Sequence, residues 1–72
     1  MMRLTMERWK KGWSMAELAR RCGANASSIS RIERRKEPPY PQRAQRIAKA
    51  VGWQGDVSLL FEEVDGDDDQ AA

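Results

Sequence analysis

The stretch Ser14–Lys36, SMAELARRCGANASSISRIERRK, decides the fold of this chain. Apolar residues recur in it at helical spacing, first over 15–22 and then over about 26–34. The first group comprises Met15, Leu18, Ala19 and Cys22, and the second comprises Ile29 and Ile32. We therefore expect two short helices, each with one apolar face, joined by a turn of about four residues.

The residues at the ends of these two segments support the same division. Ser14 and Glu17 have the spacing of a capping box, in which the serine hydroxyl accepts from the Glu17 N–H and the Glu17 carboxylate reaches back to the Ser14 N–H. Gly23 suits the left-handed position that follows a helix, and Asn25 can cap the next one. A helix, a glycine-containing turn and a second helix form the helix-turn-helix pattern.

The remaining segments predict three further helices, over about 4–11, 41–51 and 57–63. An apolar face on the first of them is predicted from Met6, Trp9 and Trp13. We therefore expect an all-α fold, a compact bundle of five short helices that forms one domain over residues 1–64. Residues 65–72 are acidic and have no large apolar side chain, so we expect a disordered acidic tail there.

Composition and charge narrow the class of function. Residues 1–61 hold all 13 Lys and Arg and five acids, a net charge of +8, whereas residues 62–72 hold six acids and no base. A basic domain of this size favours a nucleic-acid partner. The single Cys22 and the lack of histidine predict no disulfide, no metal and no cofactor. With no catalytic motif and no membrane-length apolar run, we expect a cytoplasmic, nucleoid-associated protein that is not an enzyme.

The run LARRCGANASSISRIERRKEPPYPQRAQRIAKAVG resembles the Cro/repressor-type, or XRE-like, helix-turn-helix family. The family pattern has SISRIERG-like residues followed by a proline and LxxIAxALG, and the likeness covers about residues 4–61. It implies a lambda-repressor-like fold and a regulator of transcription, typically a repressor, that binds double-stranded operator DNA in a sequence-specific way. One departure is Met15, where the family often has a glutamine that reaches a phosphate.

The second helix of such a motif enters the major groove, where base edges can be distinguished. Its outward positions are therefore the candidates for base contacts: Ala26, Ser27, Ser30 and Arg31. Arg31 is the strongest of them, because a guanidinium can bind guanine O6 and N7 together. Ser28 is placed on the core side by its spacing from Ile32.

Contacts to phosphate are expected from helix N-termini and from flanking cations. The candidates are Ser14, Asn25, Arg34, Arg35, Lys36, Tyr40 and Arg43. The resemblance also implies a structural ion pair between Arg8 and Glu33, which would tie the first helix to the third.

The end of the domain carries several large apolar residues, Trp53, Leu59, Leu60 and Phe61. Any that the core does not use favour a homodimer, which would match an operator of two-fold symmetry. Two alternatives stay open: an antitoxin that also binds a toxin partner, and a protein-interaction module without a DNA role.

Overall fold

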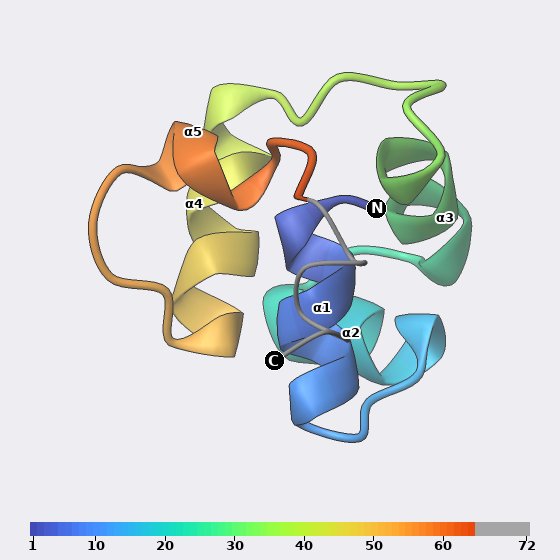
Figure 1. Ribbon diagram of the computed structural model, residues 1–72. Coiled ribbons are helices and arrows are strands. Elements are labelled where there is room, and N and C mark those ends of the chain that lie inside the picture. Colours follow the sequence, from blue (N-terminus) through green and yellow to red (C-terminus); the bar gives the residue numbers. More distant parts are fainter. Residues whose placement is uncertain (65–72) are drawn as a thin grey trace.

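The computed structural model describes residues 1–64, which form five helices and no strand (Figure 1). Their bounds are α1 Arg3–Lys10, α2 Met15–Cys22, α3 Ala26–Glu33, α4 Pro41–Val51 and α5 Val57–Leu60. The predicted all-α fold of five short helices is confirmed. The predicted acidic tail, residues 65–72, lies outside the described residues. Among residues 1–64, no helix has the length and apolar character needed to cross a membrane.

One hydrophobic core joins all five helices. α2 packs against both α3 and α4, while α5 packs against α4 and α1. α1 lies near the middle of the molecule in Figure 1, with α4 and α5 on one side and α3 on the other. The fully buried side chains are Leu4, Leu18, Ile29, Ile32, Ile47 and Leu60. Every helix contributes to this set, so the orientation of α2 and α3 depends on packing across the whole domain.

Each of the helices α1 to α4 is followed by a residue with positive φ, which ends the helix. Three of these residues are glycines, Gly12, Gly23 and Gly52, and the fourth is Arg35, with a φ of 61°. After α3, the Arg35 N–H donates to the Ile32 carbonyl at 3.0 Å and the Lys36 N–H donates to the Arg31 carbonyl at 2.8 Å. These two bonds are those of a Schellman motif. Arg35 thus occupies a left-handed position that usually carries glycine.

The packing register of α1 differs from the sequence prediction. Leu4 and Arg8 face the interior, whereas Trp9 is 56% exposed. The predicted apolar face through Met6, Trp9 and Trp13 is therefore wrong at its central residue. The physical reason is the long side chain of Arg8, which reaches inward to a buried carboxylate and so turns Trp9 toward solvent.

α5 is shorter than predicted, because it ends at Leu60 and not near residue 63. The segment after it pairs with the N-terminal segment instead. The Arg3 N–H donates to the Glu62 carbonyl at 2.9 Å, and the Val64 N–H donates to the Met1 carbonyl at 2.7 Å. These long-range bonds satisfy backbone groups that would otherwise continue the helix.

Candidate nucleic-acid interface

The motif helices α2 and α3 are each capped by a side chain. Ser14 Oγ accepts from the Glu17 N–H at 3.0 Å, and Asn25 Oδ1 accepts from the Ser28 N–H at 2.8 Å. The second bond of the predicted capping box is replaced, because the Glu17 carboxylate accepts from Arg20 and from Arg21 Nε. The caps set where each helix begins, and they leave other N–H groups of the first turns facing outward.

The outer face of α3 carries small side chains and one arginine. Ile29, Ile32 and Ser28 are buried on the inner face, as the sequence indicates. The four residues predicted to contact bases lie at the surface to different degrees: Ala26, Ser27 and Arg31 are exposed, and Ser30 is half-buried. Small side chains let the backbone of a helix approach a binding partner closely. Among the four residues, Arg31 alone has a long side chain that can donate several hydrogen bonds.

Arg31 is held by an acid that the sequence reasoning did not single out. Its Nε donates to Glu37 Oε1 at 3.0 Å, and its Nη2 lies 3.5 Å from Ser28 Oγ. The other oxygen of the same carboxylate, Oε2, accepts from Arg43 Nη1 at 3.0 Å. Glu37 therefore joins α3 to α4 through two guanidinium groups. Its position as the one acid in the run Arg34–Tyr40 was a signal available in the sequence.

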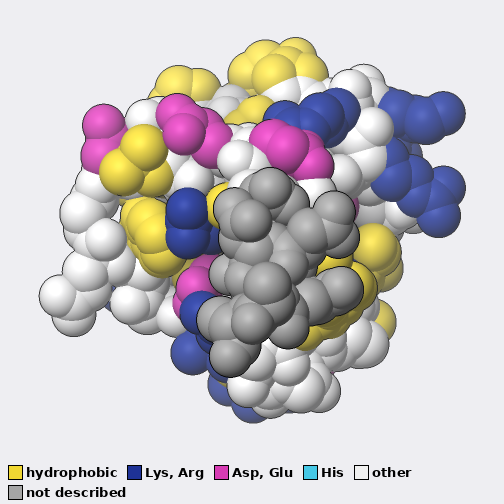
Figure 2. Space-filling model, in the orientation of Figure 1, with side chains coloured by type: hydrophobic (Ala, Val, Ile, Leu, Met, Phe, Trp, Pro, Cys, Tyr) yellow, Lys and Arg dark blue, Asp and Glu magenta, His cyan; other side chains and the backbone are white. Residues whose placement is uncertain are grey.

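Several cationic and polar groups surround this face. Arg34 and Lys36 are exposed and form no ion pair with any of residues 1–64. Tyr40 is 60% exposed at the start of α4, and Arg43 lies one turn further on. Figure 2 shows Lys and Arg side chains gathered on the side of the molecule where α3 and the following loop lie.

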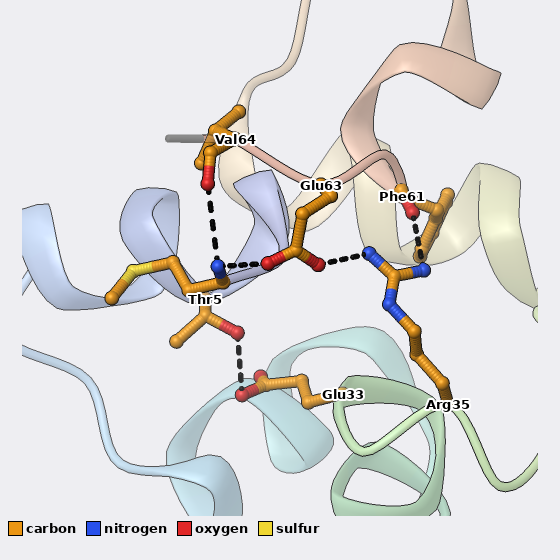
Figure 3. A network of polar contacts seen from close by, with 7 residues as sticks. Thr5, Glu33, Arg35, Phe61, Glu63 and Val64 are labelled. Atoms are coloured by element: carbon orange, nitrogen blue, oxygen red, sulfur yellow. Dashed lines mark hydrogen bonds and ion pairs between the residues drawn. The ribbon is translucent and has the colours of Figure 1, made fainter. Parts of the chain in front are cut away.

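Arg35, another predicted phosphate contact, is turned toward the C-terminal segment. Its Nη2 donates to Glu63 Oε1 at 2.7 Å and its Nη1 donates to the Phe61 carbonyl at 3.3 Å (Figure 3). Glu63 also binds the amino group of Met1. The left-handed backbone at Arg35 points its side chain toward the C-terminal segment, so the arginine ties the end of α3 to that segment.

Arg8 and Glu33 form a bidentate ion pair beneath the motif. Arg8 Nε donates to Glu33 Oε2 and Nη2 donates to Oε1, both at 2.9 Å. Thr5 Oγ1 donates to the same carboxylate at 3.0 Å (Figure 3), and Arg8 Nη1 donates to the Trp13 carbonyl at 3.0 Å. The two charged side chains are only 8% and 4% exposed. Charge-assisted bonds of this kind fix both distance and orientation, so α3 is held firmly on α1.

Hydrogen bonds and burial shift the pKa values of several groups within residues 1–64. Hydrogen bonds from Arg20 and Arg21 lower the pKa of Glu17, and bonds from the amino terminus and Arg35 lower that of Glu63. Hydrogen bonds from Ser58 lower the pKa of Asp56, the N-cap of α5. Burial raises the pKa of the Cys22 thiol, whose Sγ lies 3.7 Å from the Ala19 carbonyl. Cys22 therefore packs as a small hydrophobic residue.

Comparison with known proteins adds to this geometry. The model of the helix-turn-helix domain family matches residues 2–60 of the chain, which include all five helices. The chain belongs to the helix-turn-helix domain family.

This helix-turn-helix protein is also similar to a protein of Neisseria meningitidis serogroup B described as a Neisseria hypothetical transcription factor. The two are 38% identical over 45 residues, which is 62% of this chain and 42% of the relative. The chain thus spans less than half of that relative's length. No solved structure matches the chain.

Proposed function

We propose that this helix-turn-helix protein is a sequence-specific regulator of transcription that inserts α3 into the major groove of double-stranded DNA. The observation that carries the proposal is the exposed face of α3, where small residues surround Arg31 and the flanking cations Arg34 and Lys36 form no ion pair within residues 1–64. An arginine on such a face can bind guanine through two hydrogen bonds. The similarity to the Neisseria protein, described as a hypothetical transcription factor, also supports a role in transcription.

Phosphate contacts position the protein and do not read sequence. We assign them to the starts of α2 and α3, at Ser14 and Asn25, and to the flanking residues Arg34, Lys36, Tyr40 and Arg43. Arg35 is set apart from these residues because its guanidinium is turned toward the C-terminal segment, where it binds Glu63 and the Phe61 carbonyl. In the Cro/repressor-type interpretation, the bound protein represses by excluding polymerase from the promoter.

We also propose that the protein acts as a homodimer. Leu60 is fully buried, so it belongs to the core, whereas its neighbour Leu59 is 44% exposed. An open groove of about 340 Å³ lies on another side of α5, between α4 and α5, and its lining includes Pro39, Val57 and Phe61. A two-fold dimer through this surface would place two α3 helices on the two halves of one operator. Sedimentation on and off DNA tests the proposal, and one chain per symmetric operator would contradict it.

The decisive experiment compares two cations of equal charge, Arg31 and Lys36. Arg31→Ala should weaken binding to a specific duplex by ~1–3 kcal/mol and binding to a scrambled duplex much less. Lys36→Ala should weaken both about equally and lower the slope of log K against log salt by roughly one. Equal losses on both duplexes for Arg31→Ala would make it a phosphate contact. A wild-type affinity independent of salt would count against DNA binding altogether.

A further inference from the structure

Glu37 occupies an unusual place for an acid in a basic surface. It follows the Schellman turn of α3 and precedes two prolines, so its backbone is held from both sides. Its carboxylate binds Arg31 Nε with one oxygen and Arg43 Nη1 with the other, each at 3.0 Å. One acid therefore contacts the expected base-reading arginine and an expected phosphate-binding arginine together.

We propose that Glu37 is a specificity-determining residue, which positions the guanidinium of Arg31 for guanine recognition. The inference rests on the proposed function. Glu37 accepts the single N–H of Nε and Ser28 Oγ accepts one N–H of Nη2, so three N–H groups of Nη1 and Nη2 remain for other acceptors. Ser28 Oγ, which lies 3.5 Å from Nη2, belongs to a buried residue, so this contact is on the inner side of the guanidinium. The terminal edge, with its two parallel N–H groups, is the part that can bind guanine O6 and N7.

The physical benefit is preorganisation. A free arginine side chain samples many rotamers, and ordering them on DNA weakens binding. A carboxylate that already restricts Arg31 in the free protein removes part of that penalty for the correct base. Restricting the Arg31 side chain raises the affinity for a scrambled duplex much less, because Arg31 meets no guanine at the matching position there. Glu37 should therefore raise the ratio of specific to non-specific affinity.

The competing explanation is that Glu37 is merely a negative charge near DNA. A carboxylate close to phosphates repels every duplex to the same degree, whatever its sequence. Its removal would then strengthen binding to all duplexes by one common factor. A purely structural role is the weaker alternative, because the side chains of Glu37, Arg31 and Arg43 are 21%, 49% and 34% exposed. Ion pairs with this exposure contribute little to stability.

Glu17 provides a matched control. Its carboxylate also binds two arginines, Arg20 and Arg21, as that of Glu37 binds Arg31 and Arg43. Neither arginine belongs to the proposed interface. Glu17→Ala and Glu37→Ala therefore remove the same charge from similar double ion pairs, and they differ in whether Arg31 loses its partner.

The experiment uses the full chain and a duplex enriched from a random pool by wild-type protein, with a scrambled duplex beside it. Affinities are titrated at two salt concentrations. We expect Glu37→Ala to lower the ratio of specific to scrambled affinity about three- to tenfold and to leave the melting temperature nearly unchanged. Glu17→Ala should leave the ratio unchanged. In an Arg31→Ala background, Glu37→Ala should no longer change the ratio.

Two outcomes distinguish failure of the positioning role of Glu37 from failure of the proposed function. If Glu37→Ala strengthens both affinities by one factor, the positioning role is refuted while the regulator remains. If wild-type protein enriches no sequence from the pool, the proposed function itself fails. A readout independent of DNA is the Nε–H resonance of Arg31 in the free protein, which should exchange slowly with water in wild type and rapidly in Glu37→Ala. Fast exchange in both would also refute the positioning role.

Discussion

Replacing Glu33 with alanine is the sharpest test of how the motif is held. Glu33 receives three hydrogen bonds, two from Arg8 and one from Thr5, at 2.9–3.0 Å. In Glu33→Ala, the Arg8 guanidinium keeps only its bond to the Trp13 carbonyl. It would remain a nearly buried charge without a counter-ion, because its side chain is 8% exposed in the native fold.

The expected loss is large for so small a domain. Removing one partner of a buried ion pair destabilises by about 3–5 kcal/mol, because the other charge stays desolvated. A chain of 72 residues has a total stability on the order of 4–11 kcal/mol. Taking the lower figure of ~3 kcal/mol, and ~4–8 °C per kcal/mol for a domain of this size, the melting temperature should fall by roughly 12–24 °C.

Thermal and urea unfolding followed by circular dichroism measure this loss. Glu7→Ala is the control, because the exposed Lys10 is its partner at 3.3 Å and such pairs contribute below about 1 kcal/mol. A double variant, Arg8→Met with Glu33→Leu, should recover most of the stability, since apolar residues of similar volume can replace a buried pair. A melting temperature for Glu33→Ala no lower than that of Glu7→Ala would refute the buried-pair reasoning.

Three further outcomes are expected. Arg35→Gly should be more stable than Arg35→Ala by ~1–2 kcal/mol in thermal unfolding, because both variants lose the ion pair while alanine keeps a Cβ at positive φ; the reverse order would contradict a left-handed backbone there. The lowered pKa of Asp56 means that its stabilising cap is fully present above the unfolded value near pH 4 and is lost as pH falls through the lower folded value. Asp56→Asn keeps the acceptor without titrating, so unfolding measured from pH 5 to 2 should show a shallower loss than wild type, and parallel curves would argue against the cap. The buried Cys22 should react with a thiol reagent roughly 100-fold more slowly than an unfolded peptide, at a rate that rises with urea, whereas equal rates would place the thiol at the surface.

Local chemistry along the chain was enough to predict the helices of the motif. The bounds of α2 and α4 agree with the prediction, and α3 ends one residue earlier. Caps, glycine stops and apolar spacing act over three to five residues, so the sequence displays them directly. Ser14, Gly23 and Asn25 therefore mark the motif without any knowledge of the rest of the fold.

The tertiary structure decided which way the ambiguous side chains turn. Arg8 faces inward and Trp9 outward because the partner of Arg8, Glu33, lies 25 residues away on α3. Arg35 binds Glu63 across 28 residues, a contact that no pattern in the sequence indicates. The family resemblance implied the Arg8–Glu33 pair, but the residue pattern by itself does not indicate which of several cations will meet a given acid.

The same limit applies to the site itself. The small residues of α3 and Arg31 could be named from helical spacing, because their direction follows from the buried Ile29 and Ile32 on the opposite face. The role of Glu37 depends on the loop after α3, which places its carboxylate within hydrogen-bond distance of both Arg31 and Arg43, and no periodic pattern encodes that placement. Periodicity determines which face of a helix is outward, whereas long-range packing determines which groups meet there.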